Sequence, residues 1–273
     1  MQNSYSAAQS APSRIALTQA FNDLLQPERF KDYGPNGLQV EGKAQVRRIV
    51  SGVTASLALI DAAVQQGADA IFVHHGLFWR GQDGRVVGWM KQRLQKLLAH
   101  DINLYAYHFP LDAHPTLGNN AQLGKLLGFT PLEGAAPEDC RFGEQNLGWL
   151  GNTPIQTLGE LVAHVQTQLG RQVTSVTPSG FSDVDINKLA IKKIAWCTGG
   201  AQGYFEAAIA AGADVFITGE ISEPQAHYAR EMGVAYIACG HHASERYGAP
   251  AVAAHIAHAS GIAHTFIDID NPA

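Results

Sequence analysis

The sequence predicts an α/β protein built from two related lobes that contain parallel strands. Two observations lead to this fold class. A strand–helix–strand pattern occurs twice at a constant spacing along the chain. In addition, short apolar runs of the length of buried strands alternate with segments in which apolar residues recur at helical spacing. Such alternation is typical of α/β folds with parallel sheets.

The internal resemblance covers Ile49–Gly76 and Ile194–Ile221, which align without a gap. In both copies a buried strand is followed by an Ala-rich helix that ends at a glycine, and then by a second strand. These elements are Arg48–Val53, Leu57–Gln66, Gly67 and Ala70–Val73 in the first copy, and Lys193–Cys197, Tyr204–Ala211, Gly212 and Val215–Thr218 in the second. Glycine is favoured directly after a helix, and short connections between the elements imply parallel pairing with right-handed crossovers.

Each copy continues with a further helix and strand. We expect these at Gly88–His100, Ile102–Tyr107, Glu223–Met232 and Val234–Cys239, followed by a last helix around Ala251–Ser260 and a strand at Ala263–Ile269. Pro250 favours a helix that begins near it, so His241–Glu245 is predicted to form a separate turn. Pro110 favours a loop over His108–Asp112.

The middle of the chain differs in character. Residues 131–143 are rich in Pro, Gly and acidic residues and predict a loop, while Leu147–Leu150, Thr157–Leu169 and Gln172–Val176 predict strand, helix and strand. We therefore expect a first lobe at 1–127, a small linking or inserted segment at 128–189, and a second lobe at 190–273. Residues 1–12 are expected to be disordered.

Composition excludes several classes of protein. Hydrophobic residues make up 46% and charged residues 16% of the 273 residues, and the formal charge of −5 gives no basic footprint for nucleic acid. No apolar stretch approaches the length of a membrane span, and the N-terminus does not resemble a secretory signal. The three cysteines are too scattered for a disulfide framework or a thiolate zinc site. A cytoplasmic protein is expected.

Histidines provide the first functional signal. Of 12 histidines, six fall in three short windows: His74–His75, His108–His114 and His241–His242. Each window follows a predicted strand, and carboxylates accompany two of them, at Asp112 and Glu245. Because ligands collect beyond the carboxyl ends of strands in open α/β sheets, we expect these side chains to meet at the strand ends between the two lobes.

Imidazole nitrogen and carboxylate oxygen together suit Zn, Fe, Mn, Co or Ni. Neighbouring side chains on an extended segment diverge, so His74 and His75 are predicted to bind two different ions. The predicted site is therefore a dinuclear metal centre. Its ligands are His74, His75, Asp112, His241 and Glu245, with Glu245 as the bridge. Metal ligands need partners that orient them, and the candidates at strand ends are Thr54, Thr198 and Glu220.

Less specific interpretations remain open for several of these segments. An isolated His-His pair is more often a turn or an interior pair than a ligand pair. The glycine-rich run Thr198–Gly203 has the context of an anion site at a helix N-terminus, but it lacks a complete nucleotide-binding motif and is better explained as a tight turn. Phe78–Trp79 is expected to pack or to form an interface rather than to stack on a ligand.

Six motifs in order resemble one known family. They are Asp32–Val40 (DYGPNGLQV), Val73–Trp79 (VHHGLFW), His108–His114 (HFPLDAH), Trp196–Tyr204 (WCTGGAQGY), Ile217–Glu223 (ITGEISE) and Gly240–Gly248 (GHHASERYG). Together they resemble the YbgI-like proteins, also described as GTP cyclohydrolase type 2 homologues or dinuclear metal-centre hexameric proteins. The resemblance implies a two-lobed subunit, a toroidal homohexamer, two divalent ions per subunit facing an inner cavity, and the five ligands above. Glu220 stands where many members have Asp.

The first functional hypothesis is a metal-dependent hydrolase, in which His108 or Glu220 transfers protons. His108 could instead be a ligand. The family resemblance implies a nucleotide-like small-molecule substrate. The alternative is a metal-handling or regulatory oligomer without turnover, because no substrate-specificity pocket is evident in the sequence. A redox oxygenase is less favoured, since its usual two-His-one-carboxylate site is mononuclear.

Overall fold

The computed structural model describes residues 11–179 and 186–273, which form two compact units. The first unit comprises the chain up to His108 together with Ala249–Ile269, and the second comprises Phe109–Gly248 together with Asp270–Ala273. The disorder predicted for residues 1–12 concerns mainly residues 1–10, which lie outside the described part of the chain. Among the described residues, no helix is long and apolar enough to cross a membrane.

The first unit contains a five-stranded sheet with the order β1-β4-β3-β2-β12. The strands are β1 (Gly37–Val40), β2 (Arg48–Thr54), β3 (Ala70–His75), β4 (Asn103–Ala106) and β12 (Ala263–Phe266). All neighbours pair in parallel except β1, which is antiparallel to β4. The parallel strands therefore present their carboxyl ends at one edge of the sheet.

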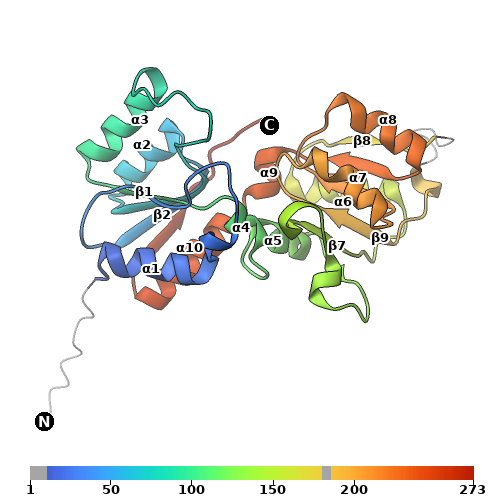
Figure 1. Ribbon diagram of the computed structural model, residues 1–273, viewed down its shortest axis with the longest axis horizontal. Coiled ribbons are helices and arrows are strands. Elements are labelled where there is room, and N and C mark those ends of the chain that lie inside the picture. Colours follow the sequence, from blue (N-terminus) through green and yellow to red (C-terminus); the bar gives the residue numbers. More distant parts are fainter. Residues whose placement is uncertain (1–10, 180–185) are drawn as a thin grey trace, which may run out of the picture. The chain divides into compact units, whose positions relative to one another are not determined.

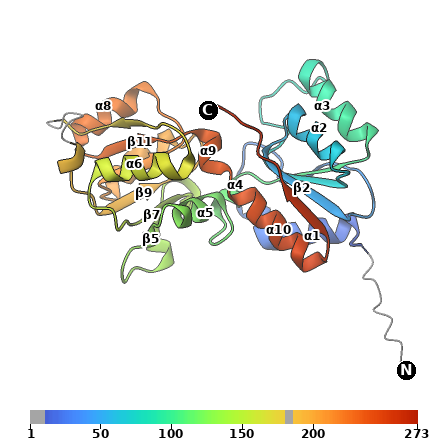
Figure 2. The ribbon, with the colours of Figure 1, turned by 180° about the vertical axis from the view of Figure 1, so that it is seen from behind.

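Helices cover both faces of this sheet (Figures 1 and 2). One face packs against α2 (Leu57–Gln65) and α3 (Gly88–Ala99), and the other faces α1 (Arg14–Leu25) and α10 (Gly248–Ser260). On the α1 side the ring of Phe21 stacks on Phe72 with 4.7 Å between ring centroids. Both side chains are fully buried, and each such burial stabilises the fold by about 1.5–3 kcal/mol.

The second unit contains a seven-stranded sheet with the order β5-β7-β9-β10-β11-β8, in which β6 also pairs with β7. The strands are β5 (Thr130–Pro131), β6 (Arg141–Phe142), β7 (Gly148–Asn152), β8 (Thr174–Val176), β9 (Lys193–Trp196), β10 (Val215–Thr218) and β11 (Ala235–Ala238). The three central strands, β9, β10 and β11, are parallel, whereas β7 and β8 add on in antiparallel fashion.

Helices cover this second sheet on both faces as well. One core cluster joins α5 (Asn119–Leu126) and α6 (Leu158–Leu169) to the sheet. The opposite face carries α7 (Phe205–Ala210) and α8 (Glu223–Met232), where Phe205 stacks on Phe216 of β10. Two five-residue helices, α4 (Phe109–Ala113) and α9 (His241–Glu245), complete the unit. Short 3₁₀ turns lie at Pro27–Arg29, Pro137–Cys140, Glu144–Asn146, Ile186–Lys188 and Gln202–Tyr204.

Most predicted elements are present, and the mixed α/β class is confirmed. The loop predicted for His108–Asp112 is wrong, because α4 spans Phe109–Ala113. Pro110 is compatible with this helix because it lies in the first turn, where its missing N–H has no partner to lose. The turn predicted at His241–Glu245 is a short helix, α9, separate from α10.

The two units do not coincide with the predicted lobes and linking segment at 1–127, 128–189 and 190–273. Residues 109–127 belong to the second unit, and the last helix and strand belong largely to the first, because β12 pairs with β2. The middle segment contributes β7 and β8 to the second sheet, where they pair with β9 and β11. Long-range strand pairing therefore sets the division of the chain.

A matching contact occurs in the two strand–helix–strand segments. The Asp69 carboxylate accepts hydrogen bonds from the backbone N–H groups of Arg47 and Arg48. In the second unit the Asp214 carboxylate accepts those of Lys192 and Lys193. The two aspartates occupy equivalent places in the aligned sequence, and each holds the start of one strand beside the start of the next.

Candidate metal-binding residues in the two units

Three histidines meet at the carboxyl edge of the first sheet. His74 and His75 are the last residues of β3, and His108 follows β4. The ring centroid of His74 lies 4.5 Å from that of His75 and 4.9 Å from that of His108. One ring nitrogen of each residue lies within 4.8 Å of the others, so the three side chains form a group that could hold a metal ion.

The Nδ1 atom of each ring has an oxygen partner. Nδ1–H of His74 donates to the carbonyl oxygen of Tyr107 at 3.1 Å. Nδ1 of His75 lies 3.1 Å from Oγ1 of Thr54, its register partner on β2. The rings are thus anchored to opposite neighbours of β3, yet they remain adjacent. The divergence expected of neighbouring side chains on a strand therefore does not separate the two rings, whose centroids are 4.5 Å apart.

His108 has the strongest of these anchors. Its Nδ1–H donates to Oδ1 of Asp32 at 2.7 Å, and the Asp32 side chain is only 3% exposed. Asn36 completes the arrangement: its Oδ1 accepts the backbone N–H of His108, and its Nδ2 donates to the second carboxylate oxygen of Asp32. Asp32 and Asn36 therefore fix both the backbone and the ring of His108.

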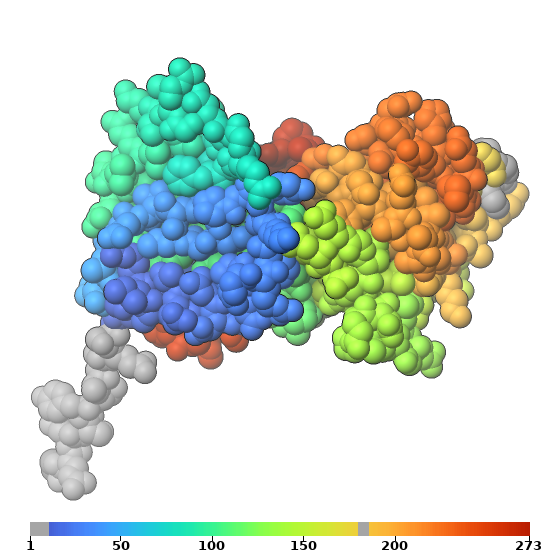
Figure 3. Space-filling model, viewed as in Figure 1, coloured from blue at the N-terminus to red at the C-terminus, as the bar shows by residue number. Residues whose placement is uncertain are grey.

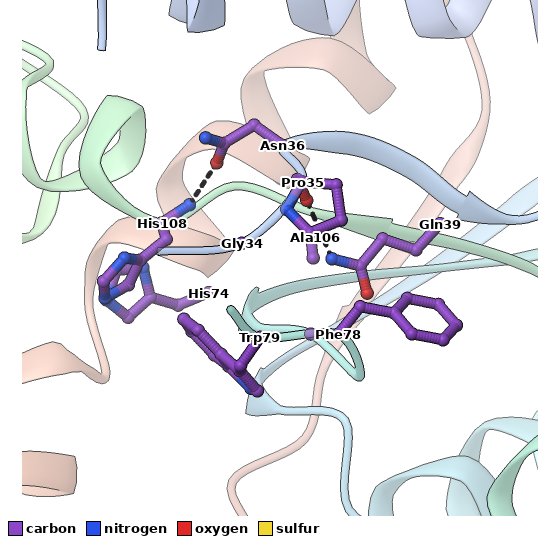
Figure 4. A pocket seen from close by; sticks show the side chains of 10 residues that line it. Gly34, Pro35, Asn36, Gln39, His74, Phe78, Trp79, Ala106 and His108 are labelled. Carbon is purple, nitrogen blue, oxygen red and sulfur yellow. Dashed lines mark hydrogen bonds between the residues drawn. The ribbon is translucent and has the colours of Figure 1, made fainter. Parts of the chain in front are cut away.

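A small pocket of about 10 Å³ lies beside His74 and His108 (Figure 4). This volume is about the minimum that holds one water molecule. The ring of Trp79 stands edge-on to His108, with 5.1 Å between centroids. Trp79 also lines a larger, open hollow of about 370 Å³ together with Tyr33 and Arg80. Phe78 packs against the core as predicted, and both Phe78 and Trp79 line the two cavities.

The second unit places a histidine and two carboxylates at its own sheet edge. In α9, His241 and Glu245 lie on one face of the helix, with 3.3 Å between Nε2 and Oε2. Nδ1–H of His241 donates to Oε1 of Glu220 at 2.6 Å. Burial lowers the pKa of His241, but the hydrogen bonds and charges of Glu245 and Glu220 outweigh burial and raise it to about 9. A metal ion would have to displace this proton.

Asp112 adds a second buried carboxylate to this edge. It accepts Nδ2–H of Asn119 at 2.9 Å and the hydroxyl of Thr198 at 3.3 Å. A carboxylate oxygen of Asp112 lies within 4.8 Å of one of Glu245, and both residues are buried. Two carboxylates this close inside a protein repel unless a proton or a cation compensates them. Their proximity fits a divalent ion.

The glycine-rich turn after β9 is a tight turn, as preferred from the sequence. Backbone N–H groups of three of its residues donate to side chains: Thr198 to Asn120, Gly199 to Ser244, and Ala201 to Thr218. These donors are therefore already used. The turn instead brings Gly199 against Glu245 and His241, at a φ of +71°.

The donor set suits a divalent ion bound by nitrogen and oxygen. His74, His108 and His241 each donate Nδ1–H to an oxygen, which leaves Nε2 as the nitrogen that can bind a metal. Among the described residues, none of the groups that could hold a metal includes a cysteine, and burial raises the pKa of the thiols of Cys197 and Cys239. The residues fit Zn, Fe, Mn, Co or Ni, as predicted.

The structure therefore groups the predicted residues into two sets. His74, His75 and His108 form one set in the first unit, and Asp112, Glu220, His241 and Glu245 form the other in the second. Each of the three predicted orienting partners hydrogen-bonds to a predicted ligand: Thr54 to His75, Thr198 to Asp112, and Glu220 to His241. The joining of the two sets in one dinuclear centre stays a prediction.

Sequence reasoning missed three partners, Asp32, Asn36 and Asn119. Asp32 and Asn36 belong to a motif already noted, but no pattern linked them to a histidine far along the chain. Asn119 is one of two adjacent asparagines after a glycine, and a pair of buried amides directly after the Asp112 segment is the signal that could have pointed to it.

Fold and site together define the class of protein: an α/β protein with two sheets, in which strand ends carry His and carboxylate side chains that could hold metal. The chain belongs to the Duf34/NIF3 (NGG1p interacting factor 3) family, whose model matches residues 13–272. The resemblance to YbgI-like proteins is thereby confirmed.

Individual relatives support the assignment over nearly the whole chain. A protein of Neisseria meningitidis described as "GTP cyclohydrolase 1 type 2 homolog" is 49% identical over 253 residues, which cover 92% of this chain and 96% of the relative. The solved structure of protein ybgI, described as of unknown function, superposes with a TM-score of 0.86 at 44% identity, covering 96% and 100% of the two chains. A Thermus thermophilus protein, TTHA1606, gives 0.79 at 30% identity, covering 96% and 100%.

Proposed function

We propose that the protein is a metal-dependent hydrolase in which the two sets of ligands jointly hold two divalent ions. One observation carries this proposal: the predicted ligands His74 and His241 each donate Nδ1–H to an oxygen, as metal-ligating histidines do. The buried carboxylate pair, Asp112 and Glu245, adds the negative charge that such ions require. Neither set alone supplies the five predicted ligands, which is why we propose that both contribute.

The ions would supply Lewis acidity, which lowers the pKa of a water molecule and stabilises negative charge on a substrate. The protein's own groups then have distinct tasks. His108 is held by Asp32 in one orientation and can move a proton at Nε2. Glu220 is engaged by His241 and by Gln202. These contacts favour a role for Glu220 in orienting His241. Proton transfer by Glu220, predicted from the sequence, remains a proposal.

We propose a nucleotide-like substrate. Several relatives are described as "GTP cyclohydrolase 1 type 2 homolog", which supports this class. The hollow beside His108 supports it as well, because Tyr33 and Trp79 offer flat aromatic surfaces and Arg80 offers a positive charge. Assembly as a toroidal homohexamer, implied by the family resemblance, belongs to the same proposal.

The test is a turnover assay of the metal-loaded protein with GTP and a panel of other nucleotides, followed by chromatography of the products. We expect hydrolysis of at least one nucleotide and a loss of at least 100-fold in His75→Ala, about 2.7 kcal/mol of transition-state stabilisation. His227→Ala is the matched control, since His227 is exposed and contacts Glu223. Metal binding without turnover of any nucleotide would refute the hydrolase and favour the metal-handling alternative.

A further inference from the structure

A separate hollow of about 300 Å³ lies in the second unit, and none of the candidate metal ligands lines it. Its walls come from α5, the segment around β5 and β6, and strands β7 and β9. The segment between β5 and β7 lies at the surface, where it forms the yellow-green projection of the second unit in Figure 3. The volume is at the lower end of the range of small-ligand pockets.

Aromatic rings form the apolar part of this hollow. Trp149 and Trp196 are register partners on β7 and β9, and their ring centroids are 5.7 Å apart. The ring centroid of Phe129 lies 5.2 Å from that of Trp196. A Cβ atom at Gly124 would lie 2.8 Å from the Trp196 ring, so the glycine lets α5 approach this wall. A flat apolar molecule fits such surroundings.

The hollow also carries a positive charge that no carboxylate among the described residues neutralises. The guanidinium carbon of Arg141 lies 3.3 Å from the ring centroid of Trp149. Within residues 11–179 and 186–273, Arg141 donates one side-chain hydrogen bond, to the carbonyl oxygen of Cys140, and pairs with no carboxylate. Burial lowers the pKa of Arg141, which reflects the same lack of a compensating charge. Lys125 lines the hollow as a second cation.

A hydrogen-bond donor in the same wall lacks an acceptor. The indole Nε1 of Trp149 is buried and has no partner among the described residues. A buried donor without an acceptor is costly, and most such groups in proteins are satisfied. Because Arg141 stacks on this ring, the cation and the unpartnered indole donor belong to the same wall of the hollow. A carboxylate is the group that accepts hydrogen bonds from both kinds of donor.

We propose that this hollow binds a small aromatic carboxylate, whose ring packs against the tryptophans and whose carboxylate pairs with Arg141 and Trp149 Nε1. A purely apolar ligand would leave the cation and the indole donor uncompensated. An inorganic anion would leave the apolar part of the hollow unfilled. Only a ligand with both parts matches the rings, the cation and the donor together. The inference is independent of the proposed hydrolase activity.

The test uses the full chain and two probes of the same shape, naphthalene-2-carboxylate and its neutral analogue naphthalene-2-carboxamide. We expect the carboxylate to bind at least tenfold more tightly by calorimetry, and Arg141→Gln to remove this difference. Arg230→Gln is the matched control, because Arg230 is an exposed arginine of the same unit. Equal affinities of the two probes, or no binding of either, would overturn the proposal.

A second measurement locates the ligand in the native protein. The protein has four tryptophans, so its indole N–H groups give a simple ¹H–¹⁵N spectrum after ¹⁵N labelling. Trp149→Phe assigns the Trp149 resonance. We expect naphthalene-2-carboxylate to shift this resonance strongly and to leave those of Trp79 and Trp89 in place. Shifts confined to Trp79 or Trp89 would place the probe elsewhere and refute the inference.

Discussion

Gly199→Ala should destabilise the protein by ~3 kcal/mol and displace Glu245, because left-handed backbone is unfavourable for alanine and the added methyl group overpacks the site. Gly199 has a φ of +71°, and a Cβ atom there would overlap Oε1 of Glu245 and lie 3.1 Å from Nε2 of His241. Urea denaturation of the two proteins without metal measures the loss of stability. After loading with metal, the variant should retain less of it than the native protein.

Gly203→Ala is the matched control for this experiment. It lies in the same glycine-rich segment, but a Cβ atom there meets nothing within 4 Å, and its φ is not positive. Its stability should change by less than about 1 kcal/mol. If Gly199→Ala were as stable as Gly203→Ala, the close approach of the turn to Glu245 would not constrain the fold as described.

Removing the groups that orient the histidines should weaken metal binding without removing a ligand. Glu220→Gln and Asp32→Asn keep the size of each side chain but take away the charge that accepts Nδ1–H of His241 and His108. Outer partners of this kind typically contribute about 10–100-fold to metal affinity. We therefore expect a reduction of this size for each variant, measured by competition with a chelator of known affinity.

Glu223→Gln provides the control for Glu220→Gln. Glu223 lies three residues away, and its side chain is 83% exposed and contacts His227. Its metal affinity should equal that of the native protein. Unchanged affinity in both Glu220→Gln and Asp32→Asn would mean that these carboxylates do not act on the metal through the histidines.

Local sequence signals were sufficient for most of the fold. Short apolar runs marked the two strands on either side of the helix Leu57–Gln65, and a glycine marked the end of that helix. The helix α8 matches its predicted bounds. The helix α4 was missed because Pro110 was interpreted as a helix breaker rather than as a first-turn residue. The pairing of β12 with β2 could not be predicted, since residues more than 200 positions apart form it.

The candidate site was predictable to a similar extent and for related reasons. The position of a residue after a parallel strand tells which sheet edge it reaches, so His75, Glu220 and their neighbours were found from the sequence. The direction in which each side chain points at the sheet edge decides which partner it contacts, and the sequence does not give this direction. The contact of Asp32 with His108 joins residues 76 positions apart, and periodicity carries no information about it.

The most direct test of the dinuclear centre is elemental analysis of the native protein, purified after growth in medium supplemented with divalent metals. We expect about two divalent ions per chain. His75→Ala and Glu245→Ala should each bind less, while His227→Ala should bind as much as the native protein. A native protein that contains no stoichiometric metal, or variants with unchanged metal content, would contradict the account.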